Sequence, residues 1–285
     1  MNRLGIILSF LLVTTSLSAQ SPDFLQRSEI VLSGGGMSYI GDLNNQSAFG
    51  RVAGAGGVGL HSRINNRWSV RGGIGIGSVS SDDYIEARNL SFRSHIYEFS
   101  AVTEFDFQPF GPGATESIWT PYIFGGLAVF HFNPEASYTD AEGNIQWVAL
   151  QPLHTEGQST SAHPDRKPYQ LIQLAMPFGI GARVRLGKNF SLTAEYGFRI
   201  TWTDYLDDVS KTYVDASVLQ AEVNDGDIAA MMADRSGEVT AGAVNAPGIK
   251  RGDDSLNDWY SFFNISLGVN LNMLLGWMRS KRCKL

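Results

Sequence analysis

The sequence predicts an all-β protein, specifically an eight-stranded antiparallel transmembrane β-barrel with long extracellular loops and short periplasmic turns. Three observations lead to this prediction: an export signal at the N-terminus, long runs of alternating apolar and polar residues, and an alternation of short and long connections between those runs. A charged fraction of 18% and a formal net charge of −6 exclude a typical disordered chain and a basic nucleic-acid-binding surface. Past the signal, no run of about 18 apolar residues indicates a spanning helix.

Residues 1–19 have the layout of a secretory signal peptide. Arg3 precedes an apolar run over residues 4–13, and small residues follow up to Ala19. The apolar run is shorter than the roughly 20 residues of a spanning helix, so we interpret the segment as a cleaved leader rather than a membrane anchor. Residues 20–271 are then expected to form the outer-membrane barrel.

The alternation of side chains is complete over residues 190–203, where even positions are apolar and odd positions are small, polar or charged. This period of two is that of a strand. Soluble strands average about 5 to 6 residues, whereas strands that cross a bilayer at a tilt need about 9 to 11. The apolar faces are expected to end in aromatic girdles that include Trp68, Tyr122, Trp202 and Trp259. The eight predicted strands are residues 30–39, 49–63, 68–77, 95–107, 120–132, 172–186, 190–203 and 259–271.

Connection lengths predict the orientation of the barrel. Short turns are expected at Asn65–Asn66, at Lys188–Asn189 and over residues 108–117. The alternate connections are much longer, and they cover residues 41–48, 80–90, 133–169 and 204–258. Outer-membrane barrels keep short turns in the periplasm and long loops outside the cell, so both termini are predicted to be periplasmic.

The predicted inward face carries charges of both signs. An eight-stranded barrel is about wide enough for side chains alone, and unpaired charges there would be costly. We therefore expect these side chains to neutralise one another across a sealed lumen, and not to line a pore or an ion pathway. The predicted lumen charge network consists of Arg71, Glu98, Glu104, Asp106, Arg183, Arg185, Glu195 and Arg199.

The long loops hold residue types that occur in hydrolases, namely His154, Ser159, Ser161, His163 and Asp165. No spacing among them places a nucleophile beside a base, so we predict that the protein is not an enzyme. A small outer-membrane lipid-modifying enzyme stays the alternative. The pairs Asp207–Asp208 and Asp253–Asp254 are interpreted as solvated carboxylates rather than a calcium site. We expect no cofactor, no metal and no small-molecule substrate.

Residues 272–285 form a basic tail, which is expected on the periplasmic side. A frayed terminus is one interpretation, and a docking segment for a periplasmic partner is the other. Cys283 is the single cysteine of the chain, and in an oxidising compartment it suggests an intermolecular disulfide. The candidate docking residues are Asn65, Asn66, Lys188, Asn189, Arg279, Lys281, Arg282 and Cys283.

Several strings of the sequence resemble the PorG family, also known as the DUF6089 outer-membrane proteins of Bacteroidota. They include SYIGDL (38–43), RNLSFRSHIYEFS (88–100), LQPLHTEGQ (150–158), KPYQLIQLAMPFGIG (167–181) and TDYLDDVSKTYVD (203–215). Some of them lie in predicted loops, where unrelated barrels are not expected to share sequence. The resemblance implies a component of the type IX secretion system, partnered by a PorK-like ring lipoprotein and a PorN-like subunit.

Two features depart from this resemblance. The last predicted strand is followed by the basic tail instead of ending the chain at an aromatic residue, and residues 216–252 have the composition of an insertion. No role is transferred to that segment. The sequence as a whole predicts a noncatalytic barrel that tethers a periplasmic ring. A peptidoglycan anchor is disfavoured because no folded periplasmic domain follows the last strand.

Overall fold

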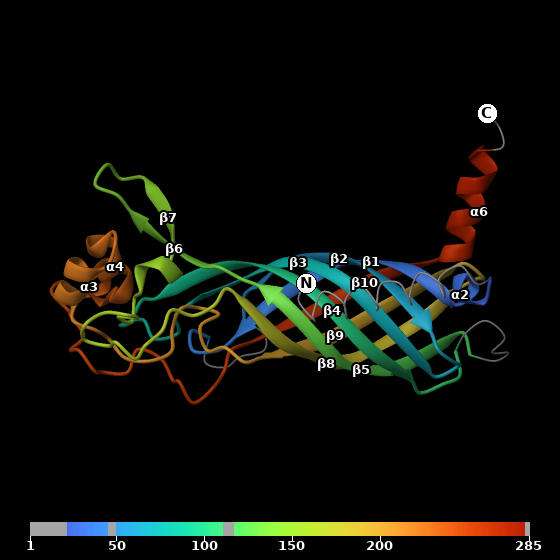
Figure 1. The fold of residues 1–285 in the computed structure, drawn as a ribbon, viewed down its shortest axis with the longest axis horizontal. Coiled ribbons are helices and arrows are strands. Elements are labelled where there is room, and N and C mark those ends of the chain that lie inside the picture. Colours follow the sequence, from blue (N-terminus) through green and yellow to red (C-terminus); the bar gives the residue numbers. More distant parts are fainter. Residues whose placement is uncertain (1–21, 45–49, 111–116, 283–285) are drawn as a thin grey trace, which may run out of the picture.

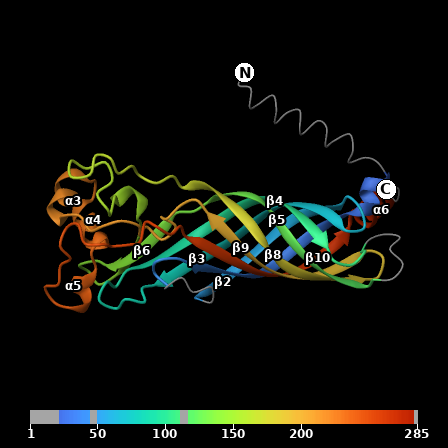
Figure 2. The same cartoon turned by 90° about the horizontal axis from the view of Figure 1, so that it is seen from below.

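The computed structural model describes residues 22–44, 50–110 and 117–282. The predicted signal peptide and Cys283 lie outside these residues. Eight antiparallel strands close into a barrel, because the order β3-β2-β1-β10-β9-β8-β5-β4 is completed by pairing between β3 and β4 (Figures 1 and 2). Closure leaves no edge strand in the barrel, which confirms the predicted fold class. The barrel strands are β1 (Ser28–Ile40), β2 (Val52–Arg63), β3 (Trp68–Asp82), β4 (Ser91–Asp106), β5 (Trp119–His131), β8 (Ile172–Leu186), β9 (Phe190–Thr201) and β10 (Trp259–Asn270).

The outer wall of the barrel is apolar in a continuous band. One row of directly paired residues crosses six neighbouring strands, and its members are between 43% and 60% exposed. In water such a band would be unstable, whereas in a bilayer it faces hydrocarbon. The row consists of Leu32, Val58, Ile74, Phe99, Val129 and Leu174.

Two details differ from the sequence prediction. Strand β3 continues to Asp82 and β4 begins at Ser91, so the connection between them is shorter than expected. Tyr122 is only 1% exposed and points into the lumen, so its assignment to an aromatic girdle is wrong. Trp68 and Trp202, at opposite ends of the wall, are 45% and 55% exposed and do lie on the outer face.

The long connections gather at one end of the barrel, here called the loop end (Figure 1). The sequence prediction missed their regular structure, because these short elements form only by packing against one another. Residues 216–252, interpreted above as an insertion, supply most of the helices. The elements are the hairpin β6 (Pro134–Thr139) and β7 (Ile145–Ala149), the 3-10 helix η1 (Gln151–Leu153), and the helices α3 (Ala216–Glu222), α4 (Gly226–Ala233) and α5 (Ser236–Val239).

The short connections lie at the opposite end, here called the turn end. In the β2–β3 turn, Asn65 Oδ1 accepts hydrogen bonds from the backbone N–H groups of Arg67 at 2.8 Å and Trp68 at 2.9 Å. Gly187 begins the β8–β9 turn with a φ of 78°, which glycine adopts without strain.

Both described termini also lie at the turn end, as the helices α2 (Pro22–Arg27) and α6 (Leu271–Arg282) (Figure 1). The tail is thus helical as far as Arg282 and is not a frayed terminus. Helix α6 runs across the barrel axis, since it stands upright in Figure 1 and is foreshortened in Figure 2. None of the helices in the described residues has the length and apolar character needed to cross a bilayer.

The apolar band predicts where a charge is tolerated. Ile74→Arg, in the middle of the band, is expected to lower the free energy of unfolding by about 2–4 kcal/mol, because the arginine must enter hydrocarbon. Val244→Arg is the control, since Val244 is 79% exposed in a loop. Urea titrations of both variants in lipid vesicles measure the difference. Equal stability of the two variants would contradict a lipid-facing band.

Candidate functional site

The lumen is filled by two groups of paired charges, and Glu104 lies at the centre of the first. Its carboxylate accepts hydrogen bonds from Arg71 Nε at 2.7 Å and from Arg183 Nη2 at 2.5 Å. Arg71 also donates to Glu195 at 2.5 Å, and the Tyr122 hydroxyl donates to the same carboxylate at 2.9 Å. Side chains from five strands are therefore joined across the barrel interior.

The second group surrounds Glu98, nearer the loop end. Arg199 Nε donates to Glu98 at 3.1 Å, and the Tyr260 hydroxyl donates to it at 2.9 Å. The Arg199 guanidinium lies 4.3 Å from the centre of the Phe262 ring, so its face is covered as well. Each of these charges has a partner of opposite sign, as burial in a narrow lumen requires.

Two basic residues of this network were missed in the sequence analysis. His61 Nε2 lies 3.3 Å from Glu104, and Arg63 Nη1 donates to Asp106 at 3.0 Å. Arg183 Nη1 reaches the other Asp106 oxygen at 3.4 Å. The sequence could have indicated them through the tight β2–β3 turn. The register of this turn pairs His61 with Arg71, so both side chains face inward.

The structure brings together seven of the eight residues predicted for the lumen network, and it places Arg185 elsewhere. Arg185 lies at the turn end, with its guanidinium 4.8 Å from the centre of the Phe110 ring. The physical reason is its position next to the end of β8, where the strand leaves the barrel interior. The seven are Arg71, Glu98, Glu104, Asp106, Arg183, Glu195 and Arg199.

Little empty volume is left between these side chains. Two cavities within the lumen measure about 40 Å³ and about 10 Å³. The larger exceeds the roughly 10–15 Å³ that one water needs, but neither offers a passage for a solute. The arrangement suits a rigid filled barrel better than a conduit.

A second polar site, absent from the sequence prediction, lies where the long loops meet above the barrel. The Tyr39 hydroxyl on β1 bonds to Asp207 Oδ2 at 2.5 Å and to Asp258 Oδ1 at 3.0 Å. Asp258 Oδ2 accepts from the Leu206 N–H at 2.9 Å. These contacts tie both ends of the 202–258 connection to the first strand. We refer to this region as the loop-end cap.

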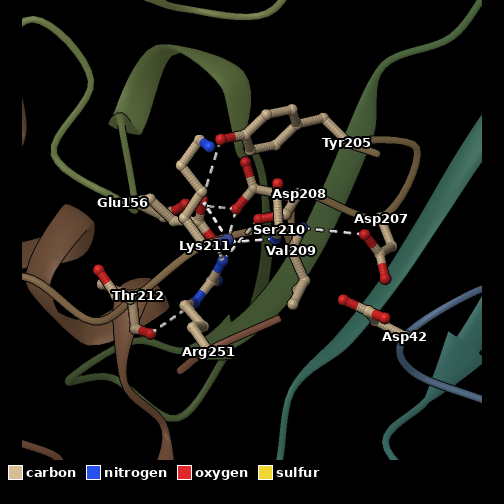
Figure 3. Close-up of polar contacts among 12 residues, drawn as sticks. Asp42, Glu156, Tyr205, Asp207, Asp208, Val209, Ser210, Lys211, Thr212 and Arg251 are labelled. Carbon is tan, nitrogen blue, oxygen red and sulfur yellow. Dashed lines mark hydrogen bonds and ion pairs between the residues drawn. The ribbon is translucent and has the colours of Figure 1, made fainter. Parts of the chain in front are cut away.

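Arg251 and Glu156 form the centre of the loop-end cap (Figure 3). Arg251 donates to Glu156 Oε1 at 3.2 Å and to the Asp208 carbonyl oxygen at 2.5 Å. Glu156 also accepts from the backbone N–H of Ser210 at 2.9 Å. Arg88, from the β3–β4 loop, donates to the Arg251 carbonyl at 2.5 Å. Asp42 of the β1–β2 connection accepts from the Asp253 N–H at 2.6 Å, so the cap joins all four long connections.

The cap holds more carboxyl groups than cations, and burial alters their protonation. Burial, together with the charges of Asp207, Asp42 and Glu156, raises the pKa of Asp204 to about 9. Burial also raises the pKa of Asp208 to about 6, although Arg251 opposes this shift. Neither carboxyl oxygen of Asp204 has a hydrogen-bond partner among the described residues. Part of the cap is therefore protonated at neutral pH.

The histidine and serine side chains of the long loops do not form a catalytic arrangement in the structure. The Ser161 hydroxyl bonds to Glu222, and among the described residues neither His154 nor His163 is hydrogen-bonded to a serine hydroxyl. Asp208 accepts from the Thr155 and Tyr169 hydroxyls. The part of the chain that the structure describes holds no group of three His, Cys, Asp or Glu side chains arranged for a metal ion.

The candidate docking residues are all at the turn end as far as they are described. Asn65 and Asn66 occupy the β2–β3 turn, and Lys188 and Asn189 occupy the β8–β9 turn. Arg279, Lys281 and Arg282 lie in the second half of helix α6. The turns and the helix are therefore available on one end of the molecule, which the sequence analysis predicted from connection lengths alone.

The central position of Glu104 gives a stability prediction. Glu104→Gln is expected to lower the free energy of unfolding by about 3–5 kcal/mol, because the buried Arg183 and the partly buried Arg71 lose their shared counter-charge. Glu135→Gln is the matched control, since its partner Arg93 is 41% exposed and such pairs contribute only about 0–1 kcal/mol. Urea unfolding in detergent micelles measures both. A similar small effect for the two variants would show that the lumen charges are solvated.

The loop-end cap predicts a dependence on pH. Because the pKa values of Asp204 and Asp208 are raised on folding, the closed cap binds protons that open loops would release, and its stability falls as pH rises through about 6 and then about 9. Amide hydrogen exchange over residues 204–215, corrected for intrinsic rates, should therefore accelerate between pH 6 and pH 9.5. Asp204→Asn should flatten the upper part of this dependence. The exposed Asp254→Asn is the control, and an equal effect of both variants would refute the assignment.

Comparison with known proteins identifies the family. A family model described as the outer membrane protein beta-barrel domain matches residues 9–224. No curated protein matches the chain. The chain is similar to the solved structure of the attachment invasion locus protein Ail of Yersinia pestis, at 9% identity and a TM-score of 0.38, with 85% of this chain and 96% of that chain covered.

Two further solved structures resemble the chain. Neisserial surface protein A shows 12% identity and a TM-score of 0.39, over 85% of this chain and 96% of that one. The outer membrane protein OprG from Pseudomonas aeruginosa shows 10% identity and a TM-score of 0.38, over 85% and 95%. The family match covers well over half of the sequence, so this chain belongs to the outer membrane protein β-barrel domain family.

Proposed function

We propose that the protein is a noncatalytic structural subunit of the type IX secretion system, an outer-membrane barrel that tethers a ring of PorK-like lipoprotein and PorN-like subunits. The filled lumen is the observation that carries a structural role. Paired charges such as Glu104–Arg183 and Glu98–Arg199 occupy the interior, and the loop-end cap lies over it. A barrel of this kind offers a rigid membrane platform and no path for a secreted protein. The assignment to the type IX secretion system is supported by the resemblance of the loop sequences to the PorG family.

In this proposal the turn end faces the periplasm. Its connections are the short ones, as is usual on the periplasmic side of outer-membrane barrels. The acidic, structured loop end then faces the cell exterior. A periplasmic ring would meet the β2–β3 and β8–β9 turns together with helices α2 and α6, which all lie at that end (Figure 1).

Helix α6 is suited to contact a partner at the membrane surface. It runs across the barrel axis, so it lies parallel to the plane of the bilayer and not through it. Its sequence begins with apolar residues and ends with Arg279, Lys281 and Arg282. A helix with this order of residues associates with an interface while offering positive charge to an acidic partner.

The proposal predicts what copurifies with the barrel. From mildly solubilised membranes of the source cell, tagged wild type should coelute with the ring lipoprotein. A variant with Arg279→Gln, Lys281→Gln and Arg282→Gln should recover about tenfold less, because three attractive charges are lost. The matched control removes three cations at the loop end, with Arg51→Gln, Lys211→Gln and Lys250→Gln, and should behave as wild type.

Two results would contradict the proposal. One is elution of the wild-type barrel alone from membranes that contain the ring. The other is turnover of membrane lipid that depends on His154 or His163, which would favour the lipid-modifying alternative.

A further inference from the structure

A hollow lies in the outer wall of the barrel, on strands β2, β3 and β4 and in the half nearer the loop end. Its volume is about 610 Å³, within the range of roughly 300–1,000 Å³ that small-molecule sites occupy. We name it the wall groove. Its outward-facing lining includes Gly54, Gly56, Ile76, Ser78, His95 and Tyr97.

Glycines form the floor of the wall groove. Gly54 and Gly56 share the outward face of β2 with the exposed Val58. They pair directly with Gly36 and Gly34 of β1, so neither strand covers the floor with a side chain. A Cβ added at Gly54 would meet no atom within 4 Å. Glycine weakens a strand, and inside one it often marks a place where a ligand or another backbone approaches closely.

The groove opens onto the lipid and is about one leaflet deep. Val58 and Ile74 belong to the lipid-facing row described above, so the groove continues a surface that already meets hydrocarbon. Four residue steps separate Gly54 from Val58, which is about 13 Å along the strand and less than half of a hydrocarbon core about 30 Å thick. Nearer the turn end, Leu60 and Val70 stand out from the wall again. A groove of this depth matches the acyl chain of one lipid better than a partner that spans the bilayer.

Polar side chains stand at the loop-end limit of the groove. The Ser78 hydroxyl and His95 Nδ1 are hydrogen-bonded at 2.9 Å, across the pairing of β3 with β4. In one tautomer of His95 the serine donates and the Nε2–H group is not used by this bond, and in the other Nδ1 donates and the serine O–H is not used. Tyr97, on the same face of β4, is 56% exposed. In either tautomer the rim therefore keeps a donor for an acceptor oxygen at the headgroup level, such as that of a phosphate.

The two cations nearest the rim along β2 and β4 are each paired with an acid. Arg93, two residues from His95 on the outward face of β4, pairs with Glu135 at 3.0 Å. Arg51, directly before β2, pairs with Asp82. These pairs leave no net charge to attract a strongly anionic headgroup. A headgroup that is neutral overall but carries a phosphate matches both the donors and the charge balance.

We propose that the wall groove binds one molecule of a zwitterionic glycerophospholipid, with an acyl chain on the glycine floor and the phosphate at Ser78 and His95. The bound chain supplies the contacts that side chains provide elsewhere on the wall, and so it completes the apolar band over β2. The site depends neither on the secretion role nor on which end of the barrel faces the cell exterior.

The test uses the full mature chain in detergent micelles, dioleoyl phosphatidylethanolamine as the probe, and native mass spectrometry as the readout. Wild type should retain one molecule of this lipid, and it should bind dioleoyl phosphatidylglycerol, which has the same chains and a net negative charge, more weakly. Gly54→Leu should weaken retention about tenfold, because the leucine side chain occupies the floor. Ser78→Ala with His95→Phe should also weaken it, because the phosphate loses its donor. Gly125→Leu is the matched control, since it adds the same side chain to an outward glycine of β5, where a Cβ would meet only the Pro177 carbonyl oxygen, at 3.9 Å.

Three results would overturn the proposal: no lipid retained by wild type, tighter binding of phosphatidylglycerol, or equal retention by wild type, Gly54→Leu and Gly125→Leu. A wild-type dimer that Gly54→Leu dissociates would assign the groove to a second copy of the chain instead. Circular dichroism of each variant shows whether it is folded. If Gly54→Leu does not fold, the Ser78→Ala, His95→Phe variant decides, and unchanged retention by that variant overturns the proposal.

Discussion

The structure depends on the requirement that every backbone polar group within a bilayer be paired inside the protein. Strands meet this requirement only by closing on themselves, which the pairing of β1 with β10 and of β3 with β4 achieves. Closure at eight strands leaves an interior too narrow for water-solvated charges. Each inward charge then needs a counter-charge on a facing strand, and the position of Glu104 between Arg71 and Arg183 is the direct consequence. The rigidity of the barrel follows from the same pairs.

The period of two in the sequence was sufficient to predict the eight strands, because in a closed barrel one face meets lipid and the other meets the lumen. It was sufficient for Glu98 and Arg199 for the same reason. It failed for Tyr122, because a ring with a hydroxyl group can face either the lipid or the lumen. It also failed for Arg185, which is on the inward face of its strand but lies at the strand end, beyond the part of the lumen that the paired charges fill. The loop-end cap could not be predicted, since Tyr39 meets Asp207 and Asp258 across 168 and 219 positions of sequence.

The two ends of the barrel solve the problem of buried charge in different ways. At the loop end, carboxyl groups exceed cations, and the excess is accommodated by protonation, as the raised pKa of Asp204 indicates. Among the described residues of the turn end, cations exceed carboxylates. Arginine does not lose its proton in a protein, so protonation equilibria offer no corresponding relief there. The excess charge at the loop end can therefore be neutralised by protonation, whereas the excess charge of the arginines at the turn end cannot.

This difference bears on the tethering role proposed above. A tether must resist force without changing shape, and a lumen crossed by ion pairs such as Arg199–Glu98 resists deformation because separating them exposes buried charge. It must also bind on one side of the membrane only. A cap whose excess carboxyl groups are protonated has little net charge to offer a partner, whereas the arginines at the turn end keep their charge. The polarity of the molecule along its axis thus follows from which charged groups can lose their charge when buried and which cannot.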